Sequence, residues 1–161
     1  MTVRFAIVGA GAIGRLHASV LATLPDAELV AVVDRSPENA VELARGHGVA
    51  ACSTLDHSAV DAVVVCTPSG AHADPAVAAL DAGRHVLVEK PIDVSLAAAE
   101  RIVAAARRTG TVASVVSQHR FDPASQAVYR ALRDRGRSRW TRTPAGTGTS
   151  STRSPPGARR W

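Results

Sequence analysis

The sequence predicts an α/β domain built on a doubly wound, parallel sheet of six strands. Short apolar runs alternate with segments of helical spacing, which is the pattern of parallel strands joined by crossover helices. Hydrophobic residues make up 46% of the chain and aromatic residues only 3%, so the core must consist mainly of Ala, Val, Leu and Ile. Such small or branched side chains suit strands that are buried on both faces. The length of 161 residues is that of one domain.

The predicted strands are apolar runs that end at a glycine or at polar residues. They cover residues 3–8, 28–33, 49–52, 61–66, 84–88 and 111–117. The expected order in the sheet is 3-2-1-4-5-6, with right-handed crossovers.

The predicted helices cover residues 12–24, 37–46, 72–82, 96–108 and 123–133. Ser36 followed by Pro37 is typical of a helix start, Ser95 is a second N-cap, and Gly83 and Gly110 are placed to end helices. The apolar residues that share one face of the first helix are Ile13, Leu16, Val20, Leu21 and Leu24.

The positive charge is concentrated near the C-terminus. The chain has 19 basic and 14 acidic residues, and residues 135–161 hold seven arginines and no acid, so residues 1–134 carry a net charge of −2. Residues 135–161 also lack Val, Leu and Ile, which predicts a disordered Arg/Ser/Thr/Pro/Gly-rich tail. Because the composition changes abruptly, one hypothesis is that this tail is an out-of-frame reading of a longer gene. Translating the DNA in its other two frames tests that hypothesis.

The two cysteines, Cys52 and Cys66, lie in no CxxC or Cys/His spacing, so no metal site is predicted. No signal-peptide pattern precedes the first strand, and its apolar run is too short to span a bilayer. We therefore expect a cytoplasmic protein with reduced thiols and no membrane partner.

A glycine-rich loop joins the first strand to the first helix. Its pattern is Gly9-x-Gly11-x-x-Gly14, with Ala12 and Ile13 between the last two glycines. The first glycine permits a tight turn, the second lets the backbone approach a pyrophosphate, and the third lets the helix pack against the strand. The following helix offers free N–H groups and its positive dipole end to phosphates. In this context the loop is typical of a Rossmann dinucleotide-binding domain.

Asp34 ends the second strand, 20 residues after Gly14. A carboxylate there accepts hydrogen bonds from the adenosine ribose and repels a 2′-phosphate, which favours NAD over NADP. The adjacent Arg35 is able to pair with a 2′-phosphate, so NADP stays an alternative.

Two further segments follow strand ends, where ligands of doubly wound sheets bind. Thr67 and Pro68 follow the fourth strand, and Glu89, Lys90 and Pro91 follow the fifth. Lys90 is the only lysine of the chain, which suggests a task that needs a compact ammonium, such as proton transfer. A proline at position 91 also allows a cis Lys90–Pro91 bond.

Two histidines are less specific candidates. His72 lies in the first turn of a predicted helix close to the same edge, where it either contacts the cofactor or has a buried or capping role. We include it among the cofactor-binding residues. His17 on the first helix is interpreted as structural.

Taken together, these motifs resemble the glucose–fructose oxidoreductase and inositol dehydrogenase (Gfo/Idh/MocA) family. The resemblance covers residues 2 to about 134. It depends on the glycine loop followed by His17, on Asp34, on Cys66-Thr67-Pro68 with His72, above all on residues 82–91 (Ala-Gly-Arg-His-Val-Leu-Val-Glu-Lys-Pro), and on Gln-His-Arg-Phe-Asp-Pro at 118–123.

The resemblance implies an NAD(P)-dependent oxidoreductase that transfers a hydride between nicotinamide C4 and a carbon of a sugar, cyclitol or related polyol. It implies that Lys90 is the catalytic residue, in contact with the substrate hydroxyl. Glu89 and Pro91 would shape the nicotinamide pocket, while Thr67 and Pro68 would line the cofactor groove.

The resemblance also implies a division of the chain. We expect an NAD(P)-binding Rossmann domain at 1–120, the start of a connection to a C-terminal substrate domain at 121–134, and the tail at 135–161. Members of this family carry a second α/β domain that forms the other wall of the active site and commonly the oligomer interface. We expect this chain to lack that domain, and therefore to bind cofactor weakly, with little or no turnover and without the oligomer interface.

Three other functions are alternatives to this one. A non-catalytic dinucleotide-binding module or sensor is compatible with the same motifs. A methyltransferase also has a glycine-rich loop, but the GxGxxG spacing and the Glu-Lys-Pro turn argue against it. Specific nucleic-acid binding through the arginine-rich tail is not expected, because the tail has only Trp140 and Trp161 as aromatic residues and no folded module.

Overall fold

A computed structural model describes residues 1–138 of the chain, with side chains for residues 1–133. The chain divides into two compact units, 1–117 and 118 onward, so the first unit ends three residues before the predicted boundary at 120. No helix in the described residues is long and apolar enough to cross a membrane.

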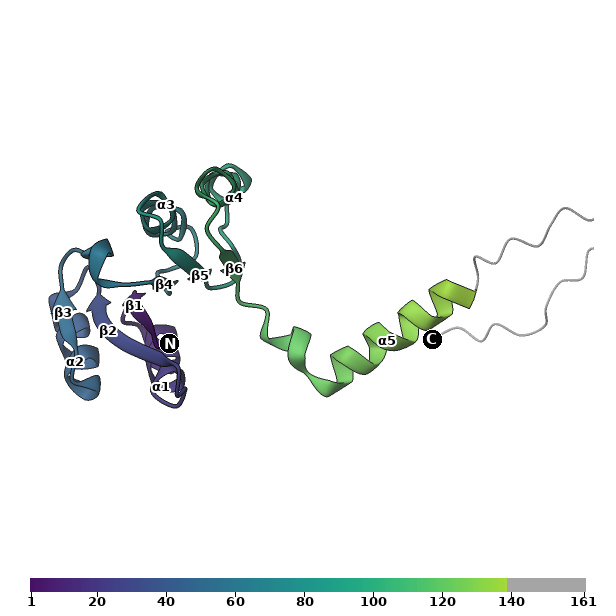
Figure 1. Cartoon of the computed structure of the whole chain (residues 1–161), viewed down its shortest axis with the longest axis horizontal. Coiled ribbons are helices and arrows are strands. Elements are labelled where there is room, and N and C mark those ends of the chain that lie inside the picture. Colours follow the sequence, from purple (N-terminus) through teal and green to yellow (C-terminus); the bar gives the residue numbers. More distant parts are fainter. Residues whose placement is uncertain (139–161) are drawn as a thin grey trace, which may run out of the picture. The chain divides into compact units, whose positions relative to one another are not determined.

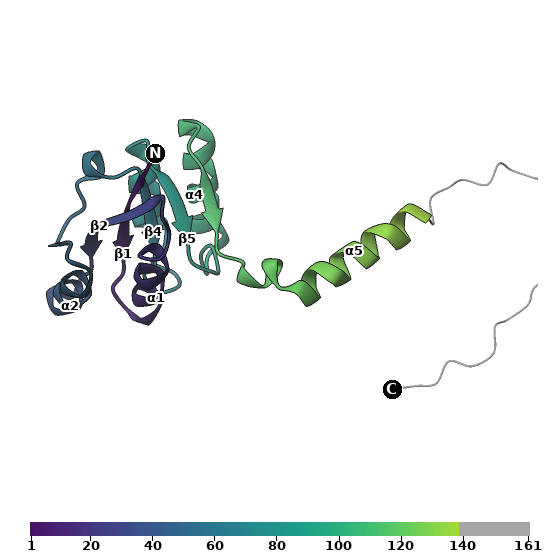
Figure 2. The ribbon, with the colours of Figure 1, turned by 60° about the horizontal axis from the view of Figure 1, so that its bottom comes forward.

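The first unit contains a six-stranded parallel sheet in the order β3-β2-β1-β4-β5-β6, which confirms the predicted class and strand order (Figure 1). Figure 2 shows β2, β1, β4 and β5 side by side in this order. The strands are β1 (Val3–Val8), β2 (Ala27–Val33), β3 (Ala50–Cys52), β4 (Ala62–Val65), β5 (His85–Val88) and β6 (Ala113–Val115). The helices of this unit are α1 (Ala12–Leu21), α2 (Pro37–His47), α3 (Ala73–Asp81) and α4 (Leu96–Thr109), with a short 3-10 helix η1 at His57–Ala59.

The predicted helix signals are present at α2 and α4. The side chains of Ser36 and Ser95 accept hydrogen bonds from the backbone N–H of Asn39 and Ala98, so both are N-caps. Gly110 takes a left-handed conformation after α4, with φ of 70°. Gly48 forms the corresponding cap after α2, slightly beyond the end predicted near residue 46.

Helices cover both faces of the sheet (Figure 1). Alternate residues of one strand point to opposite faces, so Ala6 of β1 packs in one core with α3 and α4, whereas the adjacent Ile7 packs in the other core with α1 and α2. Most of the buried helix residues are alanines, as the low aromatic content indicated.

The apolar stripe of α1 does not match its buried face. Leu21 is buried, but Ile13, Leu16 and Val20 are about half exposed, at 45%, 58% and 47%. The face that packs against the sheet contains Gly14 and Ala18 instead. Small residues are needed there because the helix lies very close to the glycine loop.

The second unit contains the 3-10 helix η2 (Gln118–Phe121) and the helix α5 (Pro123–Ser138). This helix continues to Ser138 and therefore includes the first residues of the segment expected to be disordered. The rest of that predicted tail, 139–161, lies outside the described residues.

Candidate functional site

The candidate site lies at the carboxyl edge of the sheet, where the central strands end together. Backbone hydrogen bonds continue the parallel pairing past the strand ends. The N–H of Gly9 donates to the carbonyl of Val33 at 2.8 Å, and the N–H of Glu89 donates to the carbonyl of Val65 at 3.0 Å. The loops after β1, β2, β4 and β5 therefore start from a common edge, as the strand order requires.

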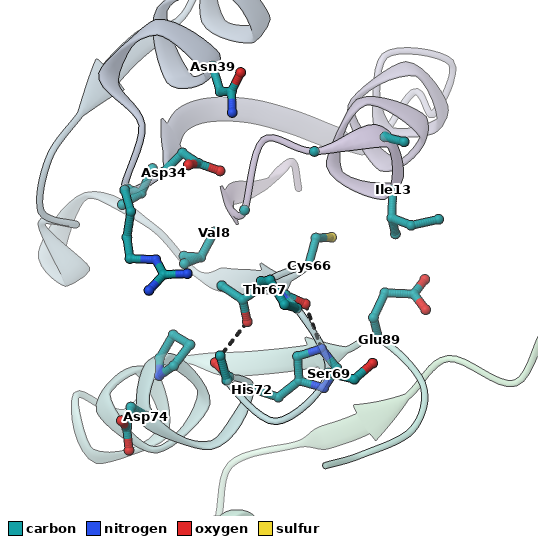
Figure 3. Close-up of a pocket in the computed structure, with 18 of the residues that line it drawn as sticks. Val8, Ile13, Asp34, Asn39, Cys66, Thr67, Ser69, His72, Asp74 and Glu89 are labelled. Atoms are coloured by element: carbon teal, nitrogen blue, oxygen red, sulfur yellow. Dashed lines mark hydrogen bonds between the residues drawn. The ribbon is translucent and has the colours of Figure 1, made fainter. Parts of the chain in front are cut away.

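A cleft of about 790 Å³ opens at this edge. Its lining includes all the residues predicted to bind a cofactor except Gly14 and Pro91. Figure 3 shows Asp34 and Asn39 on one side of the cleft, with Ile13 and Glu89 on the other. The further lining residues are Val8, Val33, Ser53, Cys66, Ser69, Ala71, Asp74 and Pro75.

The glycine loop has the conformation that its sequence predicts. Gly9 has φ of 106°, and a Cβ atom on it would lie 2.5 Å from the backbone carbonyl carbon of Cys66. Gly14 is buried under the loop, where a Cβ atom would overlap the carbonyl oxygen of Gly9. Gly11 faces open space, so the backbone at the start of α1 is accessible from the cleft. The first N–H groups of a helix lack helical partners, which makes this terminus suited to an anion.

Asp34 ties the second strand to the glycine loop. Its Oδ2 accepts a hydrogen bond from the N–H of Ala10 at 2.6 Å, and its Oδ1 accepts one from the N–H of Ser36 at 2.8 Å. Each carboxylate oxygen has a further lone pair to offer. The side chain is partly buried and lines the cleft, so it is able to support the loop and to accept bonds from a ligand. Arg35 is exposed and lines the same side.

Glu89 is held in place by two donors. Its Oε1 lies 2.9 Å from Nε2 of His17, and its Oε2 accepts a hydrogen bond from the N–H of Lys90 at 2.9 Å. Burial raises the pKa of Glu89, but the bonds from His17 and Lys90 and their positive charges outweigh burial and lower it overall. An ionised carboxylate thus lies next to Lys90, whose side chain is exposed at the cleft. The Lys90–Pro91 bond is cis.

Cys66 also lines the cleft, but its chemistry is that of a buried thiol. Burial, with a smaller contribution from the charge of Glu89, raises the pKa of Cys66 to about 12. The thiolate needed for nucleophilic attack is therefore strongly disfavoured, and no covalent role follows.

His72 lines the cleft but has the buried role that the sequence left open beside cofactor contact. Its side chain is only 1% exposed, and both ring nitrogens face backbone carbonyl oxygens. The ring has no free nitrogen to offer a cofactor, so its role is structural. Gly14 and Pro91 do not line the cleft: Gly14 packs under the loop, which is the role predicted for the third glycine, and the carbonyl oxygen of Pro91 faces Nδ1 of His72.

The structure adds residues to the predicted site. His17, interpreted as structural, contacts Glu89 and so supports the site. Asn39 in the first turn of α2 and Ser69 after β4 also line the cleft. Both residues follow strand ends closely, and this position is the one sequence signal that could have found them. Nothing in their local sequence separates them from ordinary loop residues. His119 lies in the second unit, where its Nδ1 is 2.8 Å from Oδ2 of Asp122.

Comparisons with known proteins agree with this geometry. Residues 3–117 match the family model GFO_IDH_MocA, described as the oxidoreductase family with an NAD-binding Rossmann fold. The chain is 37% identical over 134 residues to 4-carboxy-2-hydroxymuconate-6-semialdehyde dehydrogenase of a Sphingobium species, covering 80% of this chain and 42% of the relative. It is 38% identical over 137 residues to inositol 2-dehydrogenase of Rhizobium meliloti, covering 83% and 42%.

Among solved structures, the WlbA dehydrogenase of Bordetella pertussis, in complex with NADH and UDP-GlcNAcA, superposes with a TM-score of 0.79 at 33% identity. That match covers 83% of this chain and 43% of the other. The chain thus spans about two fifths of the length of the relatives that it matches. It belongs to the Gfo/Idh/MocA oxidoreductase family, and residues 3–117 form the NAD-binding Rossmann domain of that family.

Proposed function

We propose that the cleft binds NAD(H) for an oxidoreductase that acts on a sugar, cyclitol or related polyol. The observation that carries this proposal is that the glycine loop, Asp34 and the Glu89-Lys90 turn line one cleft. They come from three separate strand ends, and each supplies a different part of a dinucleotide site.

The two sides of the cleft suit the two ends of the cofactor. The start of α1 would bind the pyrophosphate through its exposed N–H groups. Asp34 and Asn39 would face the adenosine end, where Asp34 accepts bonds from the ribose hydroxyls. Ile13 and Glu89, on the opposite side, would border the nicotinamide. NAD is favoured because Asp34 repels a 2′-phosphate, while the exposed Arg35 leaves some capacity for NADP.

Lys90 is the proposed catalytic residue. The bound nicotinamide would supply hydride chemistry, and Lys90 would contact the substrate hydroxyl and move its proton. The ionised carboxylate of Glu89 would favour a positively charged side chain at the neighbouring position 90. The semialdehyde relative indicates that carbonyl substrates outside the polyols also deserve testing.

Turnover by residues 1–161 alone is expected to be low. Lys90 is exposed to water at the cleft, whereas hydride transfer requires a substrate held against the nicotinamide in a dry site. The alternative is a non-catalytic dinucleotide-binding module or sensor.

The test is a titration of the full chain with NADH and with NADPH, followed by fluorescence, and an assay against inositols, hexoses, nucleotide sugars and semialdehydes. We expect saturable NADH binding that is tighter than NADPH binding. Absence of binding to either cofactor would overturn the proposal. Lys90→Ala should leave NADH affinity within about threefold, because the pyrophosphate and ribose contacts stay intact. If any turnover is present, that variant should remove it, whereas turnover unaffected by Lys90→Ala would reject the catalytic role.

A further inference from the structure

His72 joins two loops that border the cleft. It occupies the N-cap position of α3, but its side chain makes no cap hydrogen bond to that helix. Instead Nε2 donates to the carbonyl oxygen of Thr67 at 2.8 Å (Figure 3). Nδ1 faces the carbonyl oxygens of Pro91 and Ile92 at 3.0 and 3.3 Å. Thr67 belongs to the loop after β4, and Pro91 to the turn after β5. The buried ring of His72 therefore connects the loop after β4 with the turn after β5.

The loop on the Thr67 side is internally fixed. Oγ1 of Thr67 donates to the carbonyl oxygen of Ala71 at 2.8 Å, and the N–H of Ala71 donates to the carbonyl oxygen of Pro68 at 2.9 Å. The ring of His72 leaves from the end of this loop and returns to Thr67 at its start. The ring therefore directs Nδ1 toward Pro91 from a loop that is closed by its own hydrogen bonds.

Asp93 reinforces the other side. It is the second buried polar side chain in the described part of the chain, at 9% exposure. Its Oδ1 accepts hydrogen bonds from the N–H groups of Val94 and Ser95, at 2.7 and 3.2 Å. Burial raises the pKa of Asp93, but the backbone amides of Ser95, Val94, Ala73 and His72 outweigh it and lower the pKa overall. Its negative charge lies beside the backbone of His72.

We propose that His72 is a positioning residue for Lys90. By holding the carbonyl groups of Pro91 and Ile92 against the Thr67 loop, it keeps the turn that presents Lys90 at the mouth of the cleft. The functional meaning of this contact rests on the proposed role of Lys90, but the contact itself is testable without any cofactor.

A pair of substitutions separates the two ring contacts. The amide nitrogen of an asparagine lies near the place of Nδ1, and that of a glutamine lies near the place of Nε2. His72→Asn therefore keeps a donor toward Pro91 and loses the one toward Thr67, whereas His72→Gln does the opposite. A merely structural, space-filling role predicts similar effects from both variants.

The readout is local hydrogen exchange in the full chain without cofactor. The N–H groups of Lys90, Val94 and Ser95 donate hydrogen bonds to the side chains of Glu89 and Asp93 in this segment, so their exchange reports on its order. His72→Gln should speed their exchange by about tenfold, as the loss of a buried hydrogen bond implies. His72→Asn should change it by less than about threefold. Amides of α2 serve as the internal reference, and His47→Gln on that helix is the control variant.

The single lysine provides a second readout. Reductive methylation with ¹³C-formaldehyde gives one lysine signal, from Lys90, beside that of the N-terminus. His72→Gln should shift or broaden the Lys90 signal and His72→Asn should not. Equal effects of the two variants, or no effect of His72→Gln, would overturn the positioning role.

If both variants fold poorly, a measurement on the ring of His72 in the wild-type chain tests the proposal. Long-range ¹⁵N–¹H spectra report whether Nδ1 of His72 carries hydrogen. A protonated, slowly exchanging Nδ1 supports the bond to Pro91, and a bare Nδ1 rejects it. NADH titration of the wild type tests the proposed function separately, so failure of one proposal is distinguishable from failure of the other.

Discussion

Nε2 of His17 lies 2.9 Å from Oε1 of Glu89, although the two residues are 72 positions apart in the chain. The contact links the first helix to the turn after β5, and both side chains are largely buried, at 18% and 15% exposure. It gives the carboxylate beside Lys90 a fixed orientation.

The first prediction concerns this pair. His17→Leu removes a donor that lowers the pKa of Glu89, so that pKa should rise toward its ordinary value of 4.5. Carboxyl ¹³C shifts measured over a pH series report the change directly. NADH affinity should fall by about threefold to tenfold, because Glu89 loses its orientation. His17→Gln, which keeps a donor near the place of Nε2, should restore most of the affinity, and His47→Leu should change neither quantity. A Glu89 pKa that does not move in His17→Leu would contradict the structure.

The second prediction concerns Asp34, which accepts hydrogen bonds from the N–H groups of Ala10 and Ser36. Asp34→Ala should weaken NADH binding by about 10- to 100-fold, since it removes charged acceptors for both the ribose and the glycine loop. NADPH binding should weaken less, because the repulsion of the 2′-phosphate disappears. Calorimetric titration with both cofactors measures the two affinities. The exposed Asp26→Ala is the control, and an unchanged preference for NADH in Asp34→Ala would count against the role of Asp34.

The third prediction compares two helical glycines. A Cβ atom on Gly14 would overlap the carbonyl oxygen of Gly9, so Gly14→Ala should lower the free energy of unfolding by about 1–3 kcal/mol or more. Gly46 in α2 is exposed, and a Cβ atom on it would meet no neighbouring atom within 4 Å, so Gly46→Ala should raise the free energy of unfolding by about 0.5–1 kcal/mol. Urea denaturation followed by circular dichroism gives both values. Equal effects of the two substitutions would refute the close packing of α1 on its loop.

The fourth prediction concerns acid stability. Arg4 makes two side-chain hydrogen bonds to Asp61, at 2.9 and 3.2 Å, and a third from its backbone N–H. These bonds lower the pKa of Asp61 from 3.8 to about 2. Because the folded pKa is lowered, the stabilisation is fully present above pH 3.8 and is lost as the pH falls toward 2.

Asp61→Asn should therefore be less stable than the wild type at neutral pH, with the difference shrinking between pH 3.8 and about 2. Thermal unfolding at a series of pH values measures it, and Asp26→Asn serves as the control. A stability difference that stays constant across this window would show that the charge of Asp61 does not contribute.

Much of the site could be predicted because its signals are local. Gly9, Gly11 and Gly14 act through their own backbone, and the conformation of a tight turn is encoded within a few residues. Asp34 and Lys90 closely follow apolar strands, and parallel strands bring their carboxyl ends to one edge whatever the details of packing. The alternation of apolar runs and helices indicated a parallel sheet, and the order of its six strands is the usual order of the doubly wound class.

Sequence alone determined the glycine loop and the strand-end positions of Asp34 and Lys90, because each depends on residues close together in the chain. It also determined the class of the sheet, because the apolar pattern of each strand is local even though the strand pairings, such as that of Phe5 with Ala62, are not. Tertiary structure alone decided which face of α1 is buried, and that His72 is a buried connector while His17 supports Glu89. These outcomes depend on contacts between segments up to 72 residues apart. Local patterns cannot encode them, because the partner of a polar side chain is chosen only when the packed helices and loops bring donors and acceptors together.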